Sequence, residues 1–149
     1  LMASACRVGG LTAGAPEAEL DALTRYGEAL GMVFQIRDDI LDIVAVDGQL
    51  GKPAGQDLAE GIYTLPVLVA LDEGSGDELR SILGGPLDDE AREQVRKIVA
   101  ASGGVDAAYA AAEGHIAEAR SAAAELPSDR LGEGFSALAG ELVLGLPKA

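Results

Sequence analysis

Several residue types are scarce in this chain of 149 residues, and each scarcity excludes a class of protein or a structural feature. The single cysteine, Cys6, cannot form a disulfide within the chain and is expected to be a small core residue. No apolar run approaches the roughly 18 residues that a membrane-spanning helix needs. The beginning of the chain also lacks the charged, apolar and cleavable parts of a signal peptide. These absences favour a cytoplasmic protein.

Basic residues are few as well. The chain has 11 Lys and Arg residues against 25 Asp and Glu residues, which gives a formal net charge of −14. Nucleic acid is disfavoured as a partner because phosphate binding requires clustered Lys and Arg, and an anionic membrane surface is disfavoured for the same reason. An anionic substrate would meet the same negative field, so we expect its binding to depend on a cation that neutralises the site locally.

Apolar periodicity indicates a chain of helices. Hydrophobic residues make up 48% of the sequence, tryptophan is absent, and the six prolines lie mostly at plausible boundaries. No stretch shows the alternation of a strand, and residues 46–56 form a glycine-rich polar loop. The expected helices cover residues 17–44, about 64–73, a short segment through Leu83, 88–101, 105–126 and 128–144. We therefore predict an all-α fold.

An acidic cluster within the helix predicted over 17–44 is the main functional signal. Residues 34–42 read F-Q-I-R-D-D-I-L-D. At about 100° per residue, one arc of roughly 100° contains Gln35, Asp38, Asp39 and Asp42. The arc has no basic member, although like charges at this spacing destabilise a helix by about 0.2–0.5 kcal/mol per pair. Carboxylate oxygens suit Mg²⁺, so we predict a metal site, with an ordinary solvated acidic face as the alternative.

The acidic run and the segments that follow it resemble the trans-polyprenyl diphosphate synthases. Residues 34–42 resemble that family's second aspartate-rich motif, DDxxD preceded by F-Q. Farther on, G-K at 51–52, D-L-A-E-G at 57–61 and T-L-P at 64–66 resemble further family motifs in the same order. Several ordered motifs are far more specific than DDxxD alone. The resemblance covers essentially the whole chain and implies the C-terminal part of an isoprenoid-synthase-type helical bundle.

The resemblance also implies a reaction and roles for individual residues. In that family, Mg²⁺ bridges aspartates to the diphosphate of an allylic prenyl diphosphate, whose departure leaves a carbocation that isopentenyl diphosphate attacks. The catalytic and metal-binding residues implied are Asp38 and Asp42 as direct ligands and Asp39 through a water. The substrate-binding residues implied are Gln35, Lys52 and Asp57, of which Asp57 would organise the loop. Arg37, within the motif, points away from the acids and is expected in a structural ion pair.

The first aspartate-rich motif of that family has no counterpart here. The other Asp pair, Asp88-Asp89, is followed by Glu90 and indicates a helix N-terminus. We therefore expect residues 1–149 to form a single helical segment, the C-terminal half of a synthase domain whose N-terminal half is absent, and to be inactive alone. A homodimer or an assembly with the missing half is the expected working form. Family members often carry a basic residue where this chain has Ile62, so one diphosphate contact is missing.

Two other function classes remain open. The chain fits a noncatalytic helical partner subunit, which binds diphosphate or another prenyltransferase chain without turnover, because the first motif is missing. It fits a terpene cyclase less well, because a cyclase is not expected to carry the G-K, D-L-x-E-G and T-L-P segments in this order. His115 lies alone in an alanine-rich helix near Glu118 and is expected to have a structural role.

Overall fold

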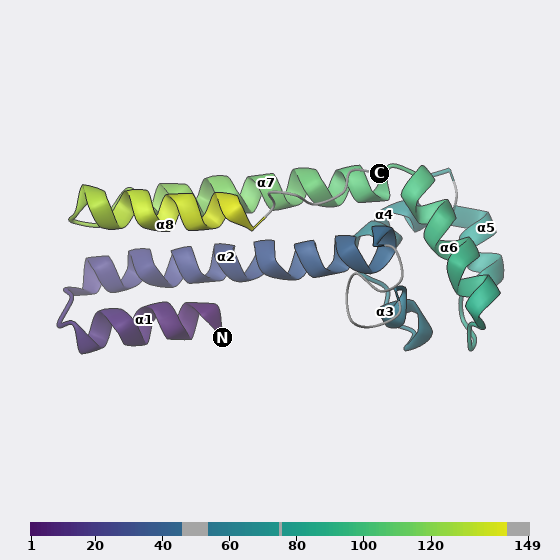
Figure 1. Ribbon diagram of the computed structural model, residues 1–149, viewed down its shortest axis with the longest axis horizontal. Helices are drawn as coiled ribbons and strands as arrows, with labels where there is room; N and C mark the ends of the chain where they lie inside the picture. Colours follow the sequence, from purple (N-terminus) through teal and green to yellow (C-terminus); the bar gives the residue numbers. More distant parts are fainter. Residues whose placement is uncertain (46–53, 75, 143–149) are drawn as a thin grey trace. The chain divides into compact units, whose positions relative to one another are not determined.

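The computed structural model describes residues 1–45, 54–74 and 76–142, with the backbone alone at 129 and 130. Every regular element in these ranges is a helix, as predicted (Figure 1). The helices are α1 (Met2–Thr12), α2 (Glu17–Val44), α3 (Gln56–Ala59), α4 (Leu65–Asp72), α5 (Gly76–Ile82), α6 (Asp89–Ala101), α7 (Gly104–Ala123) and α8 (Asp129–Glu141). None of these helices is both long and apolar enough to cross a lipid bilayer.

The chain forms two compact units, and the long helices α2 and α7 each contribute to both. Among the described residues, unit 1 comprises 1–35 and 111–142, and unit 2 comprises 36–45, 54–74 and 76–110. The aspartates therefore belong to unit 2, in the last turns of α2. The prediction that the whole chain is the C-terminal half of one longer domain stays a prediction.

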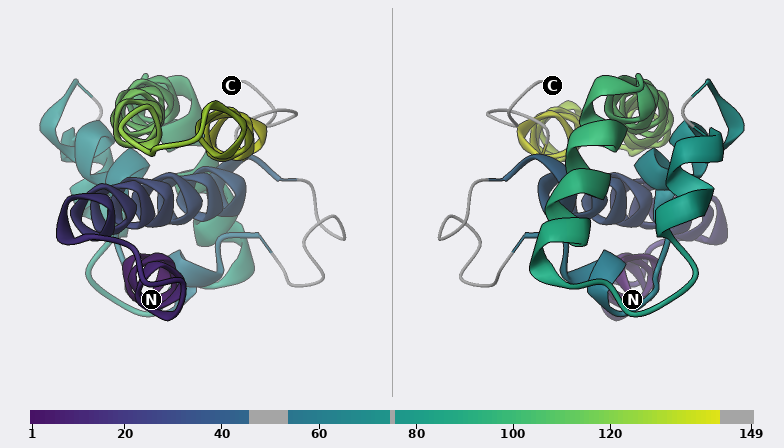
Figure 2. Two further views of the ribbon diagram at one scale, coloured as in Figure 1. Left: turned by 90° about the vertical axis from the view of Figure 1, so that its left-hand side faces the viewer. Right: turned by 90° about the vertical axis from the view of Figure 1, so that its right-hand side faces the viewer.

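Unit 1 packs four helical segments around small side chains. In Figures 1 and 2, α1 runs beside the first part of α2, and α8 runs beside the end of α7. The core cluster contains Tyr26, Ala29, Leu30, Ala119, Ala122, Ala123 and Ala139. Tyr26 meets the edge of the Phe135 ring at a centroid distance of 4.7 Å, and its hydroxyl donates to the Phe135 carbonyl at 2.9 Å. Alanine at these contacts lets the helix backbones approach closely.

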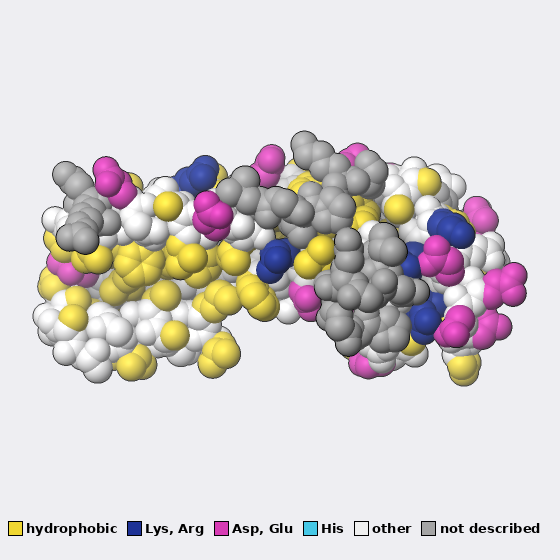
Figure 3. All heavy atoms as spheres, viewed as in Figure 1, with side chains coloured by type: hydrophobic (Ala, Val, Ile, Leu, Met, Phe, Trp, Pro, Cys, Tyr) yellow, Lys and Arg dark blue, Asp and Glu magenta, His cyan; other side chains and the backbone are white. Residues whose placement is uncertain are grey.

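The crossing of α1 over α2 depends on Gly27. A Cβ placed on Gly27 would lie only 2.6 Å from the Cα of Ala3, in the backbone of α1. Beyond this crossing, α1, the start of α2 and α8 border an apolar groove of about 470 Å³, and Figure 3 shows hydrophobic atoms gathered between α1 and α8. Leu23, Leu131 and Phe135 line this groove. Unit 1 is therefore apolar both in its core and along one open face.

Unit 2 packs α4, α5 and α6 against one another, with α5 and α6 toward the viewer in the right-hand view of Figure 2. The T-L-P segment begins α4, since Thr64 is its N-cap residue and Pro66 lies in its first turn, where proline's missing N–H costs little. Asp88 caps α6 by accepting the Ala91 N–H at 2.8 Å, which confirms the predicted helix N-terminus at Asp88-Asp89. Of these helices, α6 contacts the end of α2 through Arg96.

Candidate functional site

The three aspartates of α2 differ sharply in exposure. Asp38 is exposed, whereas Asp39 is 7% exposed and Asp42 only 2%. Burying a carboxylate is costly unless hydrogen bonds or a cation compensate it. A solvated acidic face therefore does not describe Asp39 and Asp42. None of the described residues forms an ion pair with Asp38. Of the three carboxylates, that of Asp38 is therefore the one accessible to solvent.

Backbone N–H groups of residues 55–57, at the start of the D-L-A-E-G segment, converge on Asp42. The Gln56 N–H donates to Asp42 Oδ1 at 3.1 Å, and the Asp57 N–H donates to Oδ2 at 3.2 Å. The Gly55 N–H donates to the Asp42 main-chain carbonyl at 2.8 Å. The structure thus brings two predicted site residues, Asp42 and Asp57, together through the backbone of α3.

The end of α2 is held from the other direction by Arg96 of α6. Its Nε donates to the Ile43 carbonyl at 2.9 Å, and its Nη2 donates to the Ala45 carbonyl at 2.5 Å. The last carbonyls of a helix receive no N–H donor from within the helix. The Arg96 guanidinium therefore satisfies carbonyl oxygens that would otherwise need water. Glu93 in turn pairs with Arg96 Nη1 at 2.7 Å. Sequence reasoning missed this contact, since nothing local links residues 53 positions apart.

The remaining predicted residues differ in their exposure. Gln35 is exposed on α2, about one turn before Asp38, and the Asp57 side chain is half-buried in α3. Lys52 lies outside the described residues. The ion pair expected for Arg37 does not form with any residue that the structure describes, and its buried Nε has no hydrogen-bond partner there. Within the described ranges, no three acidic, His or Cys side chains converge closely enough to enclose a metal ion.

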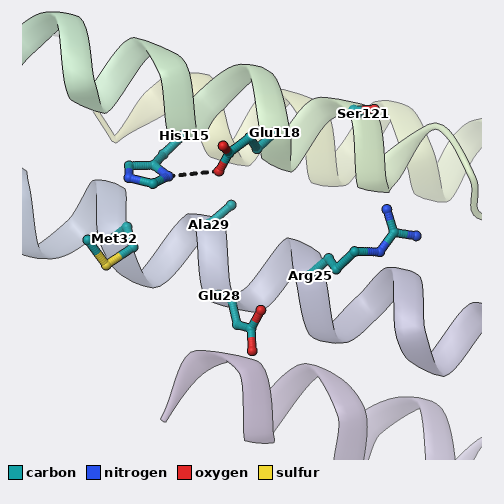
Figure 4. A pocket seen from close by; sticks show the side chains of 7 residues that line it. All are labelled: Arg25, Glu28, Ala29, Met32, His115, Glu118 and Ser121. Atoms are coloured by element: carbon teal, nitrogen blue, oxygen red, sulfur yellow. Dashed lines mark hydrogen bonds and ion pairs between the residues drawn. The ribbon is translucent and has the colours of Figure 1, made fainter.

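A separate cavity of about 440 Å³ lies in unit 1, between α2 and α7 (Figure 4). His115 Nδ1 lies 2.8 Å from the Glu118 carboxylate on the same helix, and Arg25 and Met32 line the cavity from α2. No predicted site residue lines it. The His115 contact is local to α7, and the structural role expected for this residue stays a prediction.

Comparisons with known proteins agree with one another. The profile of the polyprenyl synthetase family matches residues 1–102. A nonaprenyl diphosphate synthase of Mycobacterium tuberculosis is 39% identical over 130 residues, which are 85% of this chain and 39% of that protein. Component 2 of a heptaprenyl diphosphate synthase of Geobacillus stearothermophilus is 38% identical over 119 residues, which are 80% of this chain and 37% of that protein.

Solved structures show the same likeness. A geranylgeranyl pyrophosphate synthase from Corynebacterium glutamicum, complexed with calcium and isoprenyl diphosphate, matches with a TM-score of 0.86 and 41% identity. The match covers 97% of this chain and 46% of that chain. The chain therefore spans less than half the length of these relatives.

Proposed function

This chain belongs to the polyprenyl synthetase family, and we propose that it supplies the half of a prenyltransferase site that binds a substrate diphosphate through a metal ion. The reaction proposed is condensation of an allylic prenyl diphosphate with isopentenyl diphosphate. The observation that carries the proposal is the accessible Asp38 carboxylate, which follows Gln35 by one turn and precedes the buried Asp39 and Asp42 on the same helix. The relatives named as nonaprenyl and heptaprenyl diphosphate synthases support it.

The donor atoms present fit Mg²⁺. Mg²⁺ typically binds one or two carboxylates and takes its other ligands from water and substrate phosphates, so a closed protein cage is not needed. Asp38 would hold the ion directly and Asp39 through a water. Asp42 remains within the proposed ligand set, because each carboxylate oxygen that accepts one N–H keeps a second acceptor site.

The chain's own residues would bind and orient the diphosphate. A bound Mg²⁺ supplies positive charge that stabilises the departing diphosphate. Gln35 and Lys52 are proposed substrate contacts, and Asp57 is proposed to organise the segment beside them. With a net charge of −14, the chain would otherwise repel an anionic substrate, so binding should require the metal.

A second helical half is part of this proposal. The chain matches less than half of its relatives' length, and no second aspartate-rich motif is present in its sequence. We propose that the complementary half, either in the same polypeptide or as a separate subunit, contributes the first aspartate-rich motif, and that the assembly is homodimeric or heteromeric. The Geobacillus relative is named as one component of a synthase, which supports keeping the heteromeric assembly beside the homodimeric one.

Calorimetric titration of inorganic diphosphate into the chain tests the proposed site. Binding is expected in Mg²⁺ and is expected to disappear in excess chelator. Asp38→Ala should remove it, because the accessible carboxylate is lost. Asp72→Ala is the matched control, since it deletes an exposed acid at the end of α4 and should bind like wild type. Equal binding with and without chelator would contradict the proposal.

An activity assay separates the catalytic from the noncatalytic alternative. The chain is assayed alone and together with a complementary half that carries the first aspartate-rich motif, using labelled isopentenyl diphosphate and a short allylic diphosphate. Mg²⁺-dependent product is expected only with both halves present, and Asp38→Ala should abolish it. Diphosphate binding without product in the complete assembly would favour the noncatalytic subunit.

A further inference from the structure

Three successive backbone N–H groups point at one residue of the aspartate motif, and from this we propose that Asp42 is a positioning residue that fixes α3, with Asp57, against the metal-binding turns of α2. Its carboxylate oxygens each accept one N–H, from Gln56 and Asp57, and its carbonyl accepts the Gly55 N–H. The effect of this placement on diphosphate binding rests on the proposed function. That Asp42 holds α3 in place follows from the hydrogen bonds alone.

The helix α3 cannot hold its place alone. It contains only four residues, Gln56–Ala59, and an isolated helix of that length does not persist in water. Its first N–H groups have no partners within the helix, and an anionic side chain at this end satisfies them and complements the helix dipole. The 2% exposed carboxylate of Asp42 provides both. The position of α3 is therefore coupled directly to the aspartate helix.

The turn into α3 leaves little alternative geometry. Gly55 has a φ of 74°, a conformation that favours glycine, and a Cβ there would lie 2.8 Å from Cγ and 2.9 Å from Cδ of Arg92. Arg96, also on α6, binds the carbonyls of Ile43 and Ala45 just after Asp42. The last turn of α2 is thus fixed by α6 on its carbonyls and by α3 on the Asp42 carboxylate. A shift of α3 along α2 would break the hydrogen bonds that Asp42 accepts.

Asp42 therefore has a task beside metal binding that Asp38 does not share, and the motif alone does not distinguish the two residues. Asp38 is exposed and makes no ion pair with a described residue, so its carboxylate is accessible to an ion from solvent. Asp42 is buried and already accepts two N–H groups. Asparagine at position 42 would keep one acceptor oxygen but would turn an N–H₂ donor toward the other backbone N–H. Alanine would leave both N–H groups without their acceptor.

Amide hydrogen exchange, followed by NMR on the 149-residue chain, tests the positioning role directly. In Asp42→Ala, exchange at the Gln56 and Asp57 amides should accelerate by at least about tenfold, because each loses its acceptor. Asp42→Asn should retain protection at one of the two amides. Asp38→Asn is the matched control and should change neither. Protected amides in α7 show that each variant is folded. Unchanged exchange at both amides in folded Asp42→Ala would overturn the proposal.

Diphosphate titration in saturating Mg²⁺ separates positioning from metal ligation. Asp38→Asn should remove binding, whereas Asp42→Asn should weaken it by about tenfold and leave the number of sites unchanged. Complete loss in Asp42→Asn with normal amide protection would show that Asp42 acts on binding through metal ligation alone, and it would overturn the positioning role. Wild-type binding by Asp38→Asn would instead refute the proposed function, and the exchange result at Gln56 and Asp57 would still decide the role of Asp42.

Discussion

The two units of the molecule are stabilised by different kinds of contact. Unit 1 buries alanines around Tyr26, and its ion pairs, such as that between Arg25 and Glu125, lie on the surface. Unit 2 also buries apolar side chains, but it encloses the carboxylates of Asp39 and Asp42 and binds the end of α2 through backbone groups. Shape therefore decides the packing of unit 1, whereas the candidate site depends on satisfying buried polar groups.

The largest effect is expected where unit 1 has no room for another atom. Gly27→Ala should lower the free energy of unfolding by about 3 kcal/mol, because the new Cβ meets the α1 backbone and cannot be relieved by a side-chain rotation. Denaturant unfolding followed by circular dichroism measures the loss. Diphosphate binding at saturating Mg²⁺ should change little in the folded fraction, because the aspartates belong to unit 2.

Gly114→Ala is the matched control for that prediction. Gly114 is exposed within α7, and a Cβ there meets no atom within 4 Å. Alanine should therefore stabilise the chain by about 0.5–1 kcal/mol through helix propensity. Equal effects of the two substitutions would show that close packing of α1 on α2 is not what stabilises unit 1.

A smaller effect is expected at a polar contact of unit 2. Arg96→Met keeps much of the side-chain volume but removes the donors to the Ile43 and Ala45 carbonyls, and it should cost about 2 kcal/mol. Lys97→Met is the control, because Lys97 only pairs with Glu93 at the exposed surface and should change stability by less than about 0.5 kcal/mol. Denaturant unfolding measures the free energy of unfolding of both variants. If Arg96→Met were as stable as wild type, unit 2 would not depend on these polar contacts and the contrast with unit 1 would disappear.

The sequence predicted the helices better than it predicted how the site is assembled. The helix over 17–44 agrees with α2 because a long apolar period, Pro16 and first-turn acids mark it. The end predicted at 126 lies beyond the end of α7 at Ala123, since backbone turns replace the last helical turn there. The short helix α3 was not predicted, because four residues are too few for any period.

The missed features of the site are all tertiary. Periodicity placed the aspartates on one face of a helix, but it did not distinguish the exposed Asp38 from the buried Asp42. That difference arises because α3, 14 residues farther along, folds back onto Asp42. The contact of Arg96 with the end of α2 could not be predicted either, because it depends on where α6 lies. Motif resemblance identified the family and the residue types, and the hydrogen bonds assign different tasks to them.

Tyr26 tests a polar contact inside the apolar unit. Tyr26→Phe removes the hydrogen bond to the Phe135 carbonyl and should cost about 1 kcal/mol. Burial raises the pKa of Tyr26 from 10.0 to about 12. Its contribution should therefore be complete below pH 10.0 and decline as the pH rises through about 12, because the unfolded chain loses this proton first. Unfolding measured at both ends of that window should show a smaller alkaline loss in Tyr26→Phe than in wild type.

The smallest effect is expected at the surface ion pair of unit 1. Arg25 donates to both oxygens of Glu125, at 2.8 and 2.6 Å, and this guanidinium holds the pKa of Glu125 below its ordinary value of 4.5. The stabilisation is therefore present above pH 4.5 and is lost as the pH falls through the lower folded-state pKa. Both side chains are 51% exposed, so water and salt screen the pair. Glu125→Gln should be slightly less stable than wild type at neutral pH and equal to it in acid. Glu113→Gln is the control, because it alters an exposed acid of α7, and it should show no such pH-dependent difference. If the Glu125→Gln deficit were unchanged in acid or in high salt, charge would not be its cause, and this surface contact would resemble the backbone-anchored contacts of unit 2.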